Sequence, residues 1–152
     1  MYSKEEASQL RQQFWITFGK YMKPIPSVGG LPVNWVNYKT GVKHVWFKMN
    51  AEQHKASIAI VFTHPDRELQ LLYFEQLKAF KNLFKAAVNE EWEWNAEAKN
   101  EFGALQCQVS KSLSNCSIYN QQNWPSLISF LKPRIIALDQ FWEDVKPIFE
   151  AL

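Results

Sequence analysis

Two short motifs in the sequence have the residue types that metal-dependent nucleases use. Pro65-Asp66 is followed later in the chain by Glu97-Ala98-Lys99, which matches the PD…(D/E)xK signature. That chemistry needs the carboxylates and the lysine on adjacent strands, where they converge on a divalent cation. We expect Asp66 instead to cap a helix, because a helix N-terminus favours an anionic side chain. A metal-dependent nuclease, or a degenerate relative of one, therefore stays an alternative function.

Histidine and cysteine show no spacing typical of a catalytic or metal site. His44, His54 and His64 are ten residues apart, which matches neither a helix nor a strand period, so we do not expect them to bind a metal together. Cys107 alternates with polar residues and is expected to be a buried thiol. The sequence also has no GxSxG motif, glycine-rich phosphate loop or dinucleotide-binding fingerprint. We predict a protein without catalytic residues, metal ligands or a cofactor.

A cluster of basic and aromatic residues is the stronger candidate for a binding surface. Lysines gather around a tryptophan in a stretch that we expect to form a β-hairpin. Lysines with an interleaved aromatic ring are typical of sheet surfaces that bind single-stranded nucleic acid, because bases stack on the ring. The candidate contact residues are Lys43, His44, Trp46 and Lys48. The alternative is an ordinary solvated sheet face, with Trp46 covered by a loop or helix.

The composition predicts a folded domain that could position such a surface. The chain has 152 residues, of which 47% are hydrophobic and 15% aromatic, enough to bury the core of a single domain over residues 1–152. Lys and Arg number 17 against 15 Asp and Glu, so net charge alone predicts no affinity for nucleic acid. We expect no signal peptide and no membrane contact, because the chain opens with polar residues and lacks an apolar run of about 18. Cys107 and Cys116 have no CxxC spacing, which favours a cytoplasmic protein with reduced thiols.

Three helices are predicted where apolar residues recur every three or four positions. The first covers residues 3–22 and begins with a capping box of Ser3 and Glu6. The second covers residues 63–88 as one long helix. The third covers residues 123–152, where we expect Pro133 to kink or split it.

Strands are predicted between these helices, where apolar and polar residues alternate or a short run is wholly apolar. Thr40-Gly41 is predicted to be a two-residue hairpin turn, and residues 56–62 a central strand covered on both sides. The predicted strands are residues 33–39, 42–49, 56–62, 91–94 and 105–110. The sequence thus predicts an α+β fold with a mostly antiparallel sheet of about five strands, in the order α-β-β-β-α-β-β-α.

Two large apolar residues do not fit the stripe of the second predicted helix. Leu71 and Phe74 fall on the side that carries its lysines. Burying both would contribute roughly 3–6 kcal/mol before ordering costs, so we expect a partner for them. We predict that the C-terminal helix covers them. A homodimer or an unknown protein partner that binds at Leu71 and Phe74 is the alternative.

With this order of elements, several packing motifs point to a family. These are Phe14-Trp15, the helix around Leu77, Trp92 with Trp94, and residues 120–131 with Trp124-Pro125. On them the chain resembles an uncharacterised bacterial domain-of-unknown-function family, found alone or C-terminal to restriction-endonuclease-like domains. The resemblance implies a fold and a nucleic-acid or defence context, and it carries over no catalytic residues. We predict a non-enzymatic interaction module, with a nucleic-acid-binding accessory as the alternative.

Overall fold

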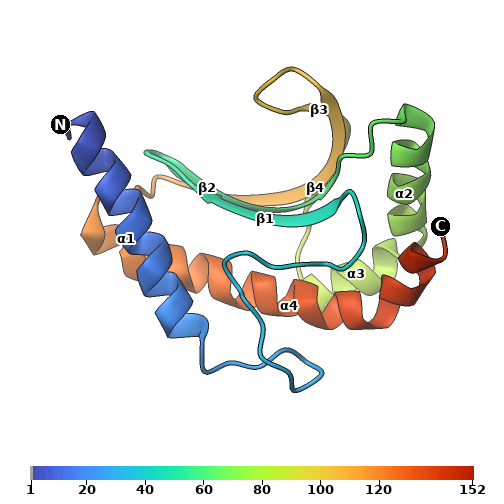
Figure 1. Ribbon diagram of the computed structural model, residues 1–152, viewed down its shortest axis with the longest axis horizontal. Coiled ribbons are helices and arrows are strands. Elements are labelled where there is room, and N and C mark those ends of the chain that lie inside the picture. The colour runs from blue at the N-terminus through green and yellow to red at the C-terminus, as the bar shows by residue number, and fades with distance from the viewer. Residues whose placement is uncertain (1) are drawn as a thin grey trace.

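The computed structural model describes residues 2–152, which build one antiparallel sheet and the helices packed on it (Figure 1). The α+β fold with an antiparallel sheet is as predicted, but the sheet has four strands rather than about five. In chain order the elements are α1 Lys4–Met22, β1 Val45–Ala51, β2 Lys55–Phe62, α2 Arg67–Ala79, α3 Lys81–Val88, β3 Glu93–Lys99, β4 Leu105–Ser114, the 3-10 helix η1 Gln121–Asn123, and α4 Trp124–Glu150.

The strands lie in the order β1-β2-β4-β3, so β2 is central, as residues 56–62 were predicted to be. Phe62 pairs with Val45 on one side and with Cys107 on the other. The ladder between β3 and β4 is interrupted by a register shift between Asn95 and Ala98. At this irregularity an extra length of β3 must be accommodated, which bends the strand. Figure 1 shows the end of the β3–β4 hairpin bending up on the side of the sheet away from α4.

The two faces of the sheet differ in what covers them. One face packs against α4, with α1 beside that helix (Figure 1). Alternation along the strands sends the residues of this face into the core, among them Phe47, Ile60 and Val109, all of which are buried. No helix within residues 2–152 lies over the other side, which we call the open face (Figure 1). Its residues include Trp46, Lys48, Ser57, Asn95, Gln108 and Ser110, and also Ala59 and Val61 of β2, which are buried although no helix of residues 2–152 covers them.

The helix α4 forms the floor of the core and is continuous. Leu131, Leu138 and Trp142 are among its buried residues. The expectation that Pro133 would split this helix is wrong, because α4 runs through it without interruption. Proline removes one amide donor, so the carbonyl of Ser129 loses its intrahelical partner. Ser129 is solvent-exposed, where water can take the place of that donor.

The first predicted strand is the main error at the level of elements. Residues 33–39 form a loop, and the β1–β2 hairpin turns at residues 52–54 rather than at Thr40-Gly41. The loop is held by side chains instead of a ladder. The Trp35 indole donates to the carbonyl of Ile25 at 2.8 Å, and the Trp142 indole donates to the carbonyl of Thr40 at 2.7 Å. Buried tryptophans thus fix a segment whose alternating pattern looked like a strand.

The long predicted helix is two helices, which is the second correction. The chain leaves helical geometry at Phe80, with φ −99° and ψ 17°, and then starts α3. This break turns α3 towards α4, where the ring of Phe84 lies 5.3 Å from that of Phe141. No glycine or proline marks the break, so tertiary packing determines it.

None of the helices in residues 2–152 is long and apolar enough to cross a membrane.

Candidate nucleic-acid interface

Trp46 lies half-exposed on the open face, near the end of the sheet that α2 follows. It is 49% exposed, and its indole nitrogen donates to Thr63 Oγ1 at 3.0 Å. Lys48 Nζ is 5.9 Å from the centre of the Trp46 ring, within range of a cation–π interaction. No loop or helix of residues 2–152 buries the ring, so the part of the alternative that placed Trp46 under a loop or helix is wrong. The indole is therefore oriented and accessible.

Lys43 and His44 continue this surface beyond the start of β1. With Trp46 they line an open pocket of about 510 Å³, formed by residues 38–46. The four residues proposed from the sequence therefore lie next to one another, three around the pocket and Lys48 over the ring. We call Lys43, His44, Trp46 and Lys48 the basic surface.

His44 and His64 come together at the base of the β1–β2 hairpin. Val45 pairs with Phe62, and just outside that pair the Thr63 amide donates to the carbonyl of His44 at 3.0 Å. The two imidazole rings are 4.6 Å apart and inclined by 62°. Partial desolvation, and then the charges of His64 and Lys43, lower the pKa of His44. The sequence did not reveal this pair. The two histidines lie at similar distances on either side of the turn at residues 52–54, and the turn had been predicted at Thr40-Gly41.

The nuclease-like motif has no common site in the structure. Asp66 caps α2, since its carboxylate accepts from the amides of Glu68 at 3.0 Å and Leu69 at 3.5 Å, as predicted. The neighbouring Arg67 does reach β3, where it donates to the carbonyl of Ala96 at 2.6 Å. The pocket beside this contact is lined by neither Asp66 nor the Glu97 and Lys99 pair. Within residues 2–152 no three His, Cys, Asp or Glu side chains are grouped so as to hold a metal ion.

Cys107 lies on the core side of β4 and is fully buried. Burial raises the pKa of its thiol, although the nearby Arg67 guanidinium acts in the opposite direction. A protonated, inaccessible thiol is a poor nucleophile. Cys107 therefore serves packing, as its position in the sequence pattern predicted.

Leu71 and Phe74 are covered from within the chain. Phe74 is 1% exposed, which confirms its predicted burial, and Leu71 is half-buried. The cover of Phe74 comes from the sheet rather than from the C-terminal helix, because its ring lies 6.3 Å from Phe62 and 5.9 Å from Trp94. These two residues are thus part of the core and its margin.

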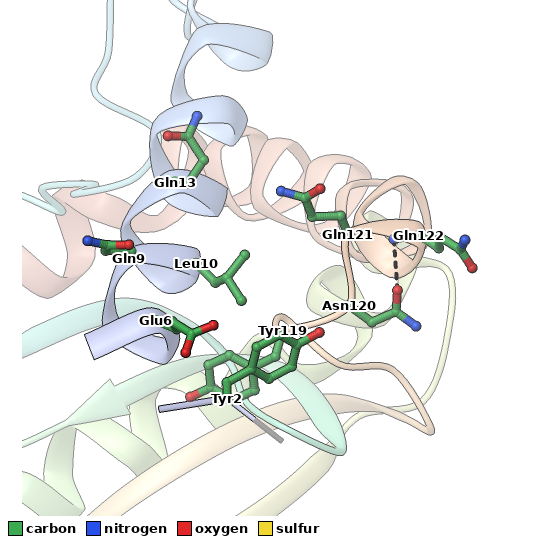
Figure 2. A pocket seen from close by; sticks show the side chains of 9 residues that line it. All are labelled: Tyr2, Glu6, Gln9, Leu10, Gln13, Tyr119, Asn120, Gln121 and Gln122. Atoms are coloured by element: carbon green, nitrogen blue, oxygen red, sulfur yellow. Dashed lines mark hydrogen bonds between the residues drawn. The ribbon is translucent and has the colours of Figure 1, made fainter. Parts of the chain in front are cut away.

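A pocket of about 620 Å³ lies between the start of α1 and the loop before η1 (Figure 2). Figure 2 shows Leu10 pointing into the space between them, with the rings of Tyr2 and Tyr119 at one end, 6.1 Å apart. Its lining is Tyr2, Glu6, Gln9, Leu10, Gln13, Tyr119, Asn120, Gln121 and Gln122. These side chains can hydrogen-bond a small polar molecule but include no cation and no pair of nucleophile and base. The pocket was not predicted, because its lining shows in the sequence only as two amides one turn apart in α1 and the run of residues 120–123.

Comparison with known proteins gives a family and no activity. No similar chain was found among curated proteins or among solved structures. A family model does match, over residues 10–146, and so covers most of the chain, including the whole sheet and the basic surface. The chain belongs to the family of the domain of unknown function DUF4268.

Proposed function

We propose that this domain is a non-enzymatic interaction module that binds single-stranded nucleic acid on the open face of its sheet. The observation that carries the proposal is the half-exposed Trp46, whose indole is held by Thr63 and flanked by Lys48. Stacking of a base on an aromatic ring contributes about 1–3 kcal/mol and tolerates any sequence, since every base has a π-face.

The charge around Trp46 suits a strand of phosphates. Lys43 and His44 line the pocket beside Trp46, and Lys48 Nζ lies 5.9 Å from the centre of its ring, so local charge can attract a polyanion although the whole chain is nearly neutral. Towards the far edge the face carries Ser110 and Gln108, whose hydroxyl and amide groups can hydrogen-bond to base edges. A strand would thus contact phosphates at β1 and bases across the sheet.

The setting of the proposal follows from the resemblance noted in the sequence. A bacterial domain that can follow a restriction-endonuclease-like domain would suit an accessory that holds nucleic acid for a catalytic partner. A cytoplasmic location is part of this proposal, because the free thiols of Cys107 and Cys116 suit a reducing compartment.

Substitution of Trp46 tests the proposal directly. We expect a labelled single-stranded oligonucleotide to bind at low salt, and Trp46→Ala to weaken binding by about 1–3 kcal/mol, as measured by fluorescence anisotropy. Affinity should fall as salt rises, with a slope of log K against log salt near −0.7 for each phosphate contacted. Tyr21→Ala is the matched control, because Tyr21 is 52% exposed with Lys132 Nζ 4.9 Å from its ring centre, but lies on α1. Absence of binding at low salt, or equal losses in both variants, would contradict the proposal.

A second candidate is a protein partner, in the form of a second copy of the chain. Leu69 and Leu72 lie one helical step apart on α2 and are 40% and 46% exposed. Two large apolar side chains on one helix face are a common feature of association surfaces. Measurement of molar mass in solution separates this candidate from the first.

A further inference from the structure

In the histidine pair beside Trp46, specific contacts hold the backbone and the ring of His44. His44 has φ 67°, in the left-handed region that residues other than glycine seldom occupy. Such backbone positions persist where surrounding structure holds them, and they cluster at functional sites. Two contacts hold His44 in this conformation. Its carbonyl accepts from the Thr63 amide at 3.0 Å, and its ring lies 4.6 Å from that of His64.

The hydrogen bonds of His64 determine what the pair can bind. Its Nδ1 accepts from the Asp66 amide at 3.0 Å, so Nδ1 carries no proton. The neutral ring must then carry its proton on Nε2, which makes that atom a donor. A metal ion would need a lone pair on Nε2, and this tautomer does not offer one. The geometry therefore favours an acceptor of hydrogen bonds, such as an oxyanion.

The charged groups around the pair also favour an anion. Lys43 precedes His44 and adds a positive charge. On the α2 side, the Asp66 carboxylate is engaged by the helix amides of Glu68 and Leu69. Arg67 lines the pocket next to His64, and its guanidinium donates hydrogen bonds to Ala96, Gln70 and Cys107. The Tyr73 ring lies 6.4 Å from that of His64. An anion at the pair would thus meet two imidazoles and a lysine.

We propose that His44 and His64 form a phosphate-binding site that holds the backbone phosphate next to the base stacked on Trp46. The inference rests on the proposed function and deepens it, since it assigns one phosphate contact to two residues. In the free protein, partial desolvation and then the charges of His64 and Lys43 lower the pKa of His44. A phosphate would oppose these effects and draw a proton onto His44, because Nδ1 of His64 is already engaged by the Asp66 amide. Binding should therefore strengthen as pH falls from about 8 to about 6.

The first experiment uses inorganic phosphate and does not depend on nucleic-acid binding. Titration of the wild-type chain with phosphate, against chloride of equal ionic strength, is followed by NMR of the histidine side chains. We expect the signals of His44 and His64 to move together and those of His54 to stay unchanged, because His54 lies in the β1–β2 turn at the other end of the hairpin. No movement of the pair, or equal movement of all three histidines, would overturn the site.

The second experiment measures oligonucleotide binding by variants of the pair. His44→Asn keeps a side chain that tolerates the left-handed backbone, and His64→Gln keeps a polar one. We expect the double variant to bind about tenfold more weakly at pH 6 and to lose the pH dependence of binding. Its slope of log K against log salt should become shallower by about 0.7, the value for one phosphate contact. His54→Gln is the matched control and should behave as wild type.

The outcomes separate the two proposals. If Trp46→Ala weakens binding while the double variant keeps the affinity, salt slope and pH dependence of wild type, the phosphate site is wrong and the nucleic-acid surface stands. If no oligonucleotide binds but phosphate moves both histidine signals, the proposed function fails and the anion site stands. Thermal unfolding of each variant checks that a loss of binding does not come from a loss of folding.

Discussion

At the scale of single residues, Asp139 is the most consequential buried polar group. It lies on α4 and is 3% exposed. Its carboxylate accepts from the Tyr38 hydroxyl at 2.6 Å, from Ser27 Oγ at 3.0 Å and from the Val28 amide at 2.8 Å. Burial, and then the bond to Asp139, raise the pKa of Tyr38 well above its usual value, so this donor stays protonated at neutral pH. One carboxylate thus connects the long loop after α1 to α4.

Removal of this carboxylate should destabilise the fold strongly. We expect Asp139→Ala to lower the free energy of unfolding by about 3 kcal/mol, because three partly buried hydrogen bonds to one buried carboxylate are lost. Urea denaturation followed by tryptophan fluorescence measures the change. Asp144→Ala, at an exposed position of the same helix, serves as the control and should change stability by less than about 0.5 kcal/mol. A loss for Asp139→Ala no larger than the control would contradict the role.

The sequence predicts residues whose partners are near along the chain. Ser3 and Glu6 form the capping box of α1, and Asp66 caps α2, because each bonds to an amide within three residues. Asp139 could not be found in this way. Its partners Ser27 and Tyr38 are more than 100 residues away along the chain, so only the fold brings them together. The histidine pair of the candidate site was missed because His44 and His64 meet only across a hairpin whose turn was predicted elsewhere.

At the scale of elements, Glu90 connects the segment after α3 to α4. Its carboxylate accepts two bonds from Arg134, each 2.8 Å long, and one from the Trp92 indole at 2.8 Å. Both ionised side chains are 22% exposed, which leaves them largely shielded from water. Burial would raise the pKa of Glu90, but the bonds from Arg134 and Trp92 outweigh it and lower the pKa. The pair fixes how β3 begins relative to the core.

Neutralisation of Glu90 should cost stability in a pH-dependent way. We expect Glu90→Gln to lower the free energy of unfolding by about 2 kcal/mol at pH 7, since Arg134 is left partly buried without a counter-ion. A lowered folded-state pKa stabilises the fold above the unfolded value, so the difference from wild type should shrink as pH falls below about 4. Chemical denaturation at several pH values measures it. Glu91→Gln removes an exposed pair with Lys85 and should leave stability unchanged, and a pH-independent loss for Glu90→Gln would refute the argument.

Predictions of elements succeeded where a local period decides the structure. The helix α1 and the strand β4 were found because apolar positions repeat along them, and the central strand β2 because it is a short, almost wholly apolar run. The segment 33–39 has a strand-like pattern, yet Trp35 uses its buried indole to hold a loop. The break at Phe80 has no local signal either, since it follows from the packing of α3 on α4. In the segment 33–39 and at the break at Phe80, tertiary contacts rather than the local sequence pattern determine the structure.

At the scale of the whole molecule, the outer side of α2 bears on the state of association. In the structure, Leu69 and Leu72 of this helix face solvent while Gln70 and Phe74 face the core. If a second copy covers these leucines, light scattering should give twice the mass of the chain, and Leu72→Lys should restore the monomer. Ile16→Lys, at an exposed apolar position of α1, is the control and should leave the mass unchanged. A wild-type monomer at high concentration rules out this dimer.

The register shift in β3 has a consequence for how copies of the sheet could polymerise. A sheet with two free, regular edges can add strands on both sides without limit, which is how fibres grow. Here β1 pairs without interruption along its seven residues, whereas β3, at the opposite edge, is interrupted between Asn95 and Ala98. Two β1 edges that met antiparallel would form a closed, two-fold contact and leave only interrupted edges outside. Growth through strand edges would therefore stop at two copies, and one irregularity far from β1 would keep the domain from forming fibres.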